Sequence, residues 1–395
     1  MRHLANPLPL LLLPLPFAIF VACASSEETP DTSRLDGGAE DSAFPETGSS
    51  EDAGDAGADV DREALRCSGD FCLVDLPNPG AYGFTKWVFR TVQFDPVVGI
   101  WALANGVLGV DEATAQLLRF DGAAWQAVHA PTLGSGADKR NIRLASLSAN
   151  GAGKLLAVGS TIDDGSGVIV RGDGTAFTTD TFEVPLEASW FAQPDLAWVA
   201  GRGGAIYRST TEGDWISESS DTGGELLAVW GSGPDEVYVS GEKQIDEHIS
   251  LGYLGHRTVS GADATWTFAT FPELQTMPFG DHAIYAGIAL AAGPRFWAAP
   301  DVLARGTTVG GETIWEAAPF DPRVALNAFW ARGPNDIWAV GNVGRVYHFD
   351  GTTWKDELLV FNGAPLVANL TGIAGTTNGE LFIVGDGVAL RRKTP

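Results

Sequence analysis

The sequence predicts an all-β protein, a seven-bladed β-propeller whose blades each contain four antiparallel strands. Three observations predict it. The chain of 395 residues contains 49 Gly and 13 Trp but only 2 Met, a composition typical of many short strands joined by tight turns. Similar segments recur about every 45 residues, which is the length of a propeller blade. Asp-Gly pairs separate strand-like runs, where glycine adopts the positive φ of a tight turn.

The repeat is clearest in AVWGSGPDEVYVSG at 228–241 and AFWARGPNDIWAVG at 328–341. Each unit reads as a strand ending in an aromatic residue, a turn, an aromatic second strand, a glycine turn, a third strand, and a fourth strand opened by an aromatic residue. In the second copy an Asp-Gly turn leads to Trp354. We interpret Asp235 and Asp336 as residues that accept hydrogen bonds from turn backbone.

Two series of aromatic or apolar markers each predict seven blades. The expected fourth-strand markers are Trp87, Trp125, Phe177, Trp215, Trp266, Trp315 and Trp354. The expected second-strand markers are Trp101, Leu156, Trp198, Tyr238, Trp297, Trp338 and Phe382.

The two ends of the repeat predict how the ring closes. The last unit starts at Leu370 and supplies three strands without a fourth. A strand-like run at 84–90, around Trp87, stands unmatched near the N-terminus. We therefore expect residues 84–90 to complete the last blade, which would close the ring and cover its strand edges.

The pattern W-G-s-G-p-x-D-v-W-a-V-G followed by h-y-D-G-t-x-W resembles a propeller repeat of secreted bacterial proteins. It is similar in style to the photosystem II assembly factor propellers and to Asp-box repeats, and it covers roughly residues 84–395. The turn FDGTTW at 349–354 lacks the serine with which an Asp box begins. The resemblance implies a β-propeller.

Residues 1–22 have the layout of a signal peptide, with Arg2 followed by an apolar run that is short for a membrane span of about 20 residues. The end of this segment, FVAC at 20–23, resembles the lipobox of bacterial lipoproteins. That resemblance implies lipidation of Cys23, and the following Ala24 implies an outer-membrane lipoprotein that faces the periplasm or the surface. The lipid anchor is then the one expected membrane contact. The alternative is an ordinary signal peptide with an incidental cysteine.

Residues 23–66 form an acidic tether that we expect to be disordered, because 13 acidic residues accompany few large apolar ones. A lead-in at 67–80 carries Cys67 and Cys72, which we expect to form a disulfide in an oxidising compartment. No second cysteine pair or nearby histidine favours a metal there. The propeller is expected at 81–395. The net charge of −25 argues against nucleic-acid binding, which needs clustered cations.

One region departs from the repeat, between residues 243 and 282, and functional loops often interrupt a regular scaffold. It contains the candidate ligand-binding residues Asp246, Glu247, His248, His256, Asp281 and His282. The alternative is a longer solvated hairpin. Neither a metal site nor a cofactor is predicted.

The sequence favours a monomeric, non-enzymatic, envelope-anchored lipoprotein whose propeller binds a protein or a glycan. The alternative is a propeller glycoside hydrolase or lyase that acts on envelope or extracellular polysaccharide. No G-x-S-x-G or H-E-x-x-H motif is present. No spacing pairs a Tyr/Glu couple with the arginines near predicted turns, which are Arg202, Arg295, Arg305, Arg332 and Arg345. Carboxylates and arginines converging at a mouth of the central channel would favour the enzyme.

Overall fold

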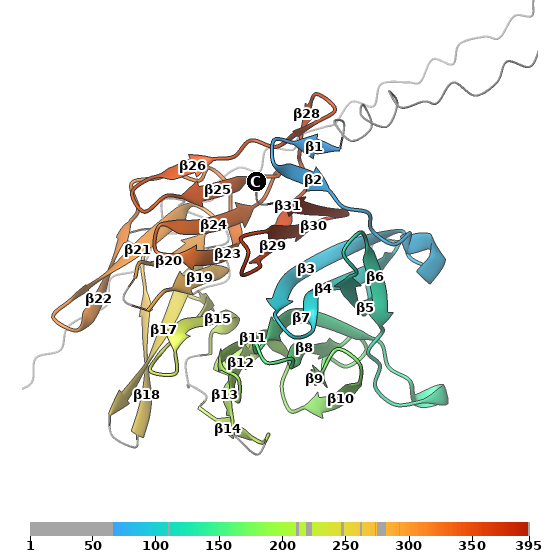
Figure 1. Cartoon of the computed structure of the whole chain (residues 1–395). Helices are drawn as coiled ribbons and strands as arrows, with labels where there is room; N and C mark the ends of the chain where they lie inside the picture. The colour runs from blue at the N-terminus through green and yellow to red at the C-terminus, as the bar shows by residue number, and fades with distance from the viewer. Residues whose placement is uncertain are drawn as a thin grey trace, which may run out of the picture. The chain divides into compact units, whose positions relative to one another are not determined.

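The computed structural model describes residues 66–393 except 110, 211–212, 219–222, 246–248, 261–262, 273, 275–281 and 292. The described part is built from antiparallel sheets arranged as seven blades (Figure 1). The first strand of each blade contacts the first strand of the next, and the first strand of the last blade contacts that of the first. The blades therefore close a ring, which confirms the predicted seven-bladed propeller.

Six blades each use four consecutive strands. Blade one contains β3 (Lys86–Asp95), β4 (Gly99–Leu108), β5 (Asp111–Phe120) and β6 (Trp125–His129). Blade two contains β7 (Ile142–Ala149), β8 (Leu155–Thr161), β9 (Gly167–Gly172) and β10 (Phe177–Phe182). Blade three contains β11 (Leu186–Gln193), β12 (Leu196–Gly201), β13 (Ile206–Ser209) and β14 (Trp215–Ser217).

Blade four contains β15 (Glu225–Gly233), β16 (Glu236–Gln244), β17 (Ser250–Ser260) and β18 (Asp263–Thr270). Blade five contains β19 (Ala286–Ala289), β20 (Arg295–Ala299), β21 (Val302–Val309) and β22 (Glu312–Ala317). Blade six contains β23 (Leu326–Gly333), β24 (Asp336–Gly341), β25 (Val346–Phe349) and β26 (Trp354–Asp356). The short pair β27 (Val360–Phe361) and β28 (Ala364–Pro365) follows blade six.

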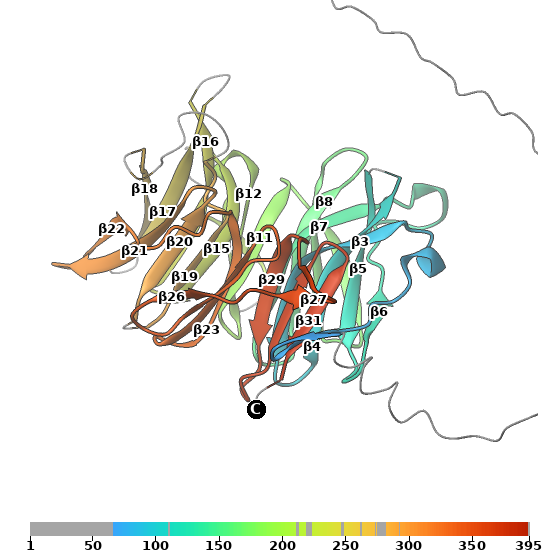
Figure 2. The same cartoon turned by 90° about the horizontal axis from the view of Figure 1, so that it is seen from above.

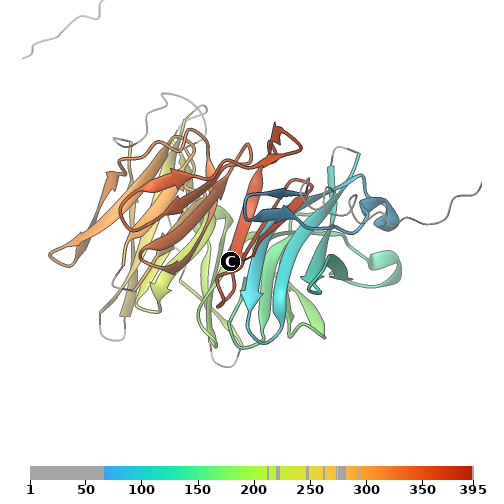
Figure 3. The ribbon, with the colours of Figure 1, turned by 45° about the horizontal axis from the view of Figure 1, so that its top comes forward.

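Blade seven joins the two ends of the described chain. It contains β29 (Leu370–Gly375), β30 (Leu381–Gly385) and β31 (Val388–Arg392), to which β2 (Phe71–Leu73) and β1 (Cys67–Ser68) add. Cys72 on β2 lies opposite Arg391 on β31, and Figure 3 shows the blue N-terminal hairpin against the red C-terminal strands. The ring is thus closed by an N-terminal strand, as predicted.

The prediction that residues 84–90 complete the last blade was wrong. Most of it belongs to β3, the first strand of blade one, and Trp87 is therefore not a fourth-strand marker. β3 pairs with β4 over its whole length, from Lys86 opposite Val107 to Asp95 opposite Gly99. A hairpin between neighbouring strands closes a much shorter loop than a pairing with the C-terminus, so the local pairing is the less costly one.

The cysteine pair is bonded as predicted, with Cys67 and Cys72 joined at an S–S distance of 2.05 Å. The disulfide cross-links β1 to β2, the two strands at the outer edge of blade seven. Between the cysteines, Phe71 is buried against Trp338 of blade six, with ring centroids 6.0 Å apart. The closing strand is therefore held by an apolar contact to the neighbouring blade as well as by backbone pairing.

The other markers lie where the sequence places them. The remaining six of the fourth-strand series start or lie within β6, β10, β14, β18, β22 and β26, and all seven of the second-strand series lie in the second strands. The second-strand residues are buried, with Trp101, Trp198 and Trp297 fully inaccessible. Burial of such large apolar side chains stabilises the packing of the blades.

In several blades a glycine lies at or near the end of the second strand, where the chain approaches itself closely. A Cβ on Gly341 would lie 2.3 Å from the carbonyl oxygen of Ala325, and a Cβ on Gly241 would lie 1.9 Å from that of Glu225. Both distances are far below contact between non-bonded atoms. This contact explains the final glycine of the repeated motifs VYVSG and IWAVG.

The Asp-Gly turns between third and fourth strands are built alike. Asp350 accepts hydrogen bonds from the backbone N–H groups of Thr352 and Thr353, and Gly351 has a φ of 97°. Asp121 and Asp173 cap their turns in the same way. No helix in the described part of the chain is long and apolar enough to cross a membrane.

Candidate functional site

A pocket of about 410 Å³ opens between blades two and three. It lies on the ring face that carries the turns between first and second strands and between third and fourth strands, which we call the turn face. Residues from the β7–β8 and β9–β10 turns form one wall, and residues from the β11–β12 and β13–β14 turns form the other. Figure 2 shows that these two blades are neighbours in the ring.

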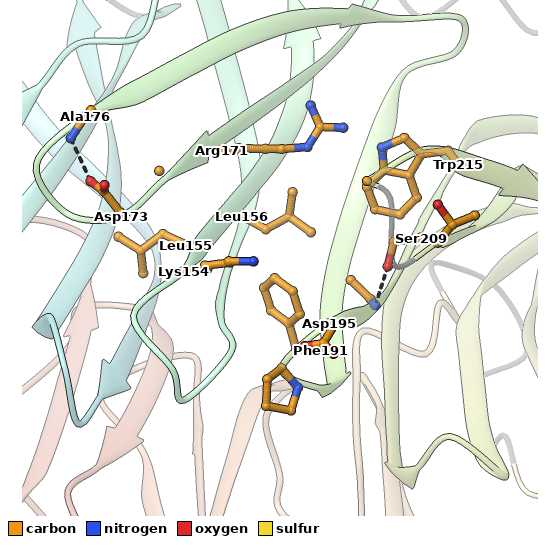
Figure 4. Close-up of a pocket in the computed structure, with 15 residues that line it drawn as sticks. Lys154, Leu155, Leu156, Arg171, Asp173, Ala176, Phe191, Asp195, Ser209 and Trp215 are labelled. Carbon is orange, nitrogen blue, oxygen red and sulfur yellow. Dashed lines mark hydrogen bonds between the residues drawn. The ribbon is translucent and has the colours of Figure 1, made fainter.

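The walls of this pocket are largely apolar (Figure 4). Leu155 and Leu156 on β8 are buried, whereas Phe191 and Trp215 are partly exposed. Pro194, Ala176 and Ala197 complete the apolar lining. Burial of an apolar side chain of a ligand against these groups would be favourable by about 25 cal/mol per Å² of area removed from water.

Most polar groups of the pocket already have partners. Arg171 forms an ion pair of 2.8 Å with Asp180 and lies 5.9 Å from the centre of the Trp215 ring. The Asp173 carboxylate accepts backbone N–H groups of Ala176 and Thr175, and these bonds lower its pKa to about 2. The Ser209 hydroxyl accepts a hydrogen bond from the backbone of Ala197.

Two charged side chains at the pocket have no ion-pair partner among the described residues, Lys154 and Asp195. Both are exposed. Figure 4 shows the Lys154 side chain extending between Leu156 and Phe191. The pocket can therefore bind an apolar group and place one cation and one anion beside it.

Four of the candidate residues predicted from the irregular region, Asp246, Glu247, His248 and Asp281, lie outside the described residues. His256 lies on β17 and lines a different cleft, between blades four and five. His282 is buried shortly before β19. No group of three or more His, Cys, Asp or Glu side chains in the described part is arranged to hold a metal ion.

The interpretation of Asp336 as a turn acceptor was wrong. Its carboxylate binds three side chains, the Trp338 indole at 2.8 Å, His348 at 2.8 Å and Arg332 at 2.8 Å. Asp235 is also not its equivalent. Asp336 lies opposite Gly333 just as Glu236 lies opposite Gly233, so the equivalent residue is Glu236.

Glu236 is used differently from Asp336. It bonds to Arg295 at the start of β20, to Ser232 and, at 3.1 Å, to the Tyr238 hydroxyl. Burial opposes ionisation of Glu236, but the hydrogen bonds from Arg295 and Ser232 outweigh it and hold the pKa below its usual value. The carboxylate therefore links blade four to blade five.

The five arginines considered for a hydrolase are spread over three blades, with Arg202 in blade three, Arg295 and Arg305 in blade five, and Arg332 and Arg345 in blade six. Four of them each pair with a different carboxylate: Arg202 with Glu187, Arg295 with Glu236, Arg332 with Asp336 and Arg345 with Asp356. Arg295 and Arg305 both line a polar cleft of about 490 Å³ between blades five and six. The five arginines therefore do not form one cluster.

One charged cluster does lie at a mouth of the central channel, on the face opposite the turn face. The Arg202 Nε is 3.3 Å from Glu187 and 3.7 Å from Glu225, which lie on the first strands β11 and β15. Burial raises the pKa of Glu225. Arg202 opposes that effect, and the carboxylates of Glu187 and Glu242 add to it.

The pocket between blades two and three was not found by sequence reasoning. Its lining comes from four turns spread over residues 154–215, outside the region between residues 243 and 282 that the sequence marks as irregular. One weak sequence signal for this pocket does exist. The second-strand marker of blade two is Leu156, which lines the pocket, whereas five of the other blades have the larger Trp or Tyr at that position.

No protein-family model matches the chain, and no curated protein matches it. Solved structures do share its fold. YCF48 bound to D1 peptide matches with a TM-score of 0.56 and 17% identity, over 82% of this chain and 96% of that one. YCF48 from Cyanidioschyzon merolae matches with a TM-score of 0.54 and 16% identity, over 82% and 98% of the chains.

The extracellular domain of the hybrid two-component system BT4673 from B. thetaiotaomicron matches with a TM-score of 0.57 and 14% identity, over 82% of this chain and 40% of that one. At such identities the likeness concerns the fold. The chain is a β-propeller protein.

Proposed function

We propose that this protein is a monomeric, envelope-anchored lipoprotein whose propeller binds a protein partner through the pocket between blades two and three. The observation that carries the proposal is the apolar lining of that pocket, with Leu155, Leu156 and Trp215 beside Lys154 and Asp195, which have no ion-pair partner among the described residues. An apolar side chain from an extended peptide would fill the pocket, and neighbouring charges of the peptide would pair with the lysine and the aspartate.

A protein partner fits this pocket better than a glycan. The leucine, alanine and proline side chains of the lining suit an apolar side chain, the Arg171 guanidinium already lies 5.9 Å from the centre of the Trp215 ring, and the Ser209 hydroxyl already accepts a backbone hydrogen bond. A propeller of similar fold, YCF48, has been solved with a bound peptide. That neighbour supports a peptide as the kind of ligand a propeller of this size can bind.

The anchor is the second part of the proposal. Cys23, at the end of the predicted signal peptide, would carry the lipid, and residues 24–66 would tether the propeller to the outer membrane. The test is to express a Cys23→Ala variant in a bacterial host and separate membranes from soluble extract. Wild type should sediment with the membranes, whereas the variant should not. A variant that still sediments with membranes contradicts the anchor.

The binding test uses a variant in which a large side chain fills the pocket. Ala176 is exposed at the β9–β10 turn and lines the pocket, so Ala176→Trp should block it without removing core atoms. Thr353 holds the same turn position in blade six, is also exposed and does not line this pocket. Thr353→Trp is therefore the matched control.

Peptides selected from a random library on the wild-type protein should lose at least tenfold in affinity for Ala176→Trp and none for Thr353→Trp. Fluorescence polarisation measures both affinities. Equal binding to the two variants would exclude the pocket as the peptide site.

The polysaccharide hydrolase or lyase is a second candidate, favoured by the cluster of Glu187, Arg202 and Glu225. A carboxyl group with a raised pKa beside a carboxylate held by arginine suits general acid catalysis. Release of reducing ends from envelope polysaccharide by wild type, abolished by Glu225→Gln, would support this candidate. Absence of any release from a broad polysaccharide panel would reject it.

A further inference from the structure

A second cleft, of about 400 Å³, lies between the outer strands of blades four and five. One wall comes from β16, β17 and β18, and the other from β22. β17 has 11 residues and β18 has 8, whereas the corresponding strands of blade six, β25 and β26, have 4 and 3. Figure 1 shows the long strands extending at the edge of the ring. The departure from the repeat therefore builds this wall.

A stack of three rings runs from the core into this cleft. Trp230 and Tyr238 are buried and lie 4.4 Å apart at 17°, and His256 lies 4.5 Å from Tyr238 at 15°. His256 is partly exposed. In the described part of the chain no other ring contacts His256, so the imidazole ends the stack and presents its outer face to the cleft.

Blade six shows why the nitrogens of His256 are available. There the equivalent ring, His348, is stacked on Trp338 at 4.1 Å and bonded through Nε2 to Asp336. In blade four the carboxylate at that position, Glu236, binds Arg295 instead. Within the described residues no side-chain hydrogen bond occupies the His256 ring. Burial lowers the pKa of His256, so the neutral ring offers one donor and one acceptor.

The rest of the lining combines hydroxyl and aromatic groups. Thr258, Thr267 and Thr313 provide hydroxyls, and the exposed Glu312 provides a carboxylate that accepts hydrogen bonds. Phe268, Phe271 and Trp315 are partly exposed rings. Ring faces pack against the C–H faces of a sugar while hydroxyl and carboxylate groups bond its hydroxyls. No Lys or Arg lines the cleft, so the Glu312 charge disfavours an anionic ligand.

We propose that this cleft binds a neutral saccharide, with one sugar ring over the outer face of His256. The site is separate from the pocket between blades two and three, and it adds glycan binding to the proposed binding of a protein. His256 provides the ring and the polar edge, Glu312 accepts sugar hydroxyls, and the long outer strands of blade four provide the wall.

The test measures binding of neutral oligosaccharides to the purified full chain by isothermal titration calorimetry. The probes are cellotetraose, laminaritetraose, maltotetraose and chitotetraose, with trigalacturonate as the acidic probe. At least one neutral probe should bind saturably. His256→Phe keeps an aromatic ring on Tyr238 and removes both nitrogens, so it should weaken that binding at least tenfold. His348→Phe changes the equivalent ring of blade six and should leave it unchanged.

Failure of all neutral probes to bind at 10 mM would overturn the proposal, as would equal binding to wild type and His256→Phe, or tighter binding of trigalacturonate. Thermal melting checks that each variant is folded. If His256→Phe does not fold, Glu312→Gln replaces it, because Glu312 is exposed; an unchanged affinity in that variant would count against the site. Peptide binding at the other pocket should be the same in all of these variants.

Discussion

Blades four and six share the pattern A-x-W-x-x-G-P in their first strand and turn, yet they are fixed in the ring differently. In blade six the carboxylate of Asp336 stays within the blade and binds Trp338, His348 and Arg332. In blade four Glu236 reaches Arg295 of blade five. On its other side Glu218, just after β14 of blade three, binds Arg257 of blade four. Blade four is thus linked by half-buried or buried ion pairs to both neighbours.

The difference teaches that the repeat specifies the inner strands of each blade, whereas single side chains decide how the outer strands are used. Glu236 is one methylene longer than Asp336 at the equivalent position, and its carboxylate forms an ion pair with Arg295 of the neighbouring blade. Among the described residues, the histidine on the third strand of blade four then has no side-chain hydrogen bond to its ring, and the proposed saccharide site rests on this difference. Each of the following variants tests one part of this contrast, from the largest expected effect to the smallest.

Glu218 should be the most sensitive residue. Its carboxylate accepts bonds from Arg257 and Arg208 and from the indoles of Trp198 and Trp266, and the Arg257 side chain is only 9% exposed. Glu218→Ala would leave a buried guanidinium unpaired, so we expect a loss of about 3–5 kcal/mol in unfolding free energy. Urea denaturation measures it. A loss below 1 kcal/mol would show that this link between blades does not stabilise the ring.

Glu236 should come next, because its ion pair with Arg295 is less buried, with exposed fractions of 20% and 15%. We expect Glu236→Ala to cost about 2–3 kcal/mol. Asp356→Ala in blade six is the control. Its ion pair with Arg345 is exposed, at 43% and 34%, so the loss should be about 0.5 kcal/mol. Similar losses in the two variants would remove the contrast between the blades.

The Glu236 pair also predicts a dependence on pH. Its folded pKa is lowered despite burial, chiefly by Arg295, so this stabilisation is present above the ordinary pKa of 4.5 and is lost as pH falls through the lowered value. Thermal melting between pH 7 and pH 3 should therefore fall less steeply for Arg295→Gln than for wild type. A parallel fall in the two proteins would contradict this assignment.

The glycines that recur in the second strands of blades four and six should be equally sensitive to substitution. Gly241→Ala and Gly341→Ala place a methyl group against a first-strand carbonyl in blades four and six alike. The backbone must shift in both cases, so we expect similar losses of roughly 1–3 kcal/mol. Calorimetric unfolding of the two variants measures them. A difference above about 2 kcal/mol would mean that the inner strands of the two blades are not equivalent.

The sequence predicted the number of blades, the second-strand markers and the disulfide because each depends on local pattern. It misplaced the closing strand because 84–90 carries an aromatic strand pattern that fits a first strand and a fourth strand equally well. β2 has only three residues, Phe71 to Leu73, too few for periodicity to identify. Asp235 and Asp336 were misaligned by one residue; the ungapped alignment of the two copies places Glu236 opposite Asp336, and the strand register agrees with it.

The two proposed binding sites were harder to predict than the fold. The pocket between blades two and three is lined by turns outside the irregular region at 243–282, so that region did not point to it. The irregular region did contain His256, but the proposed role of this ring depends on the ion pair that Glu236 forms with Arg295. That ion pair depends on the length of the glutamate side chain and on a residue of the neighbouring blade, which the sequence of a single repeat does not reveal.

The pairing of β2 with β31 also affects the order in which the chain can fold. Cys72 meets Arg391 across more than 300 intervening residues, so the ring cannot close until the C-terminal strands have been synthesised. Contacts of such sequence separation slow folding. If the chain is exported as proposed, its N-terminus would cross the membrane first. β2 would then have an unpaired edge until β31 follows. The early disulfide, which spans only five residues, can form before that partner arrives and would hold the waiting strand as a hairpin.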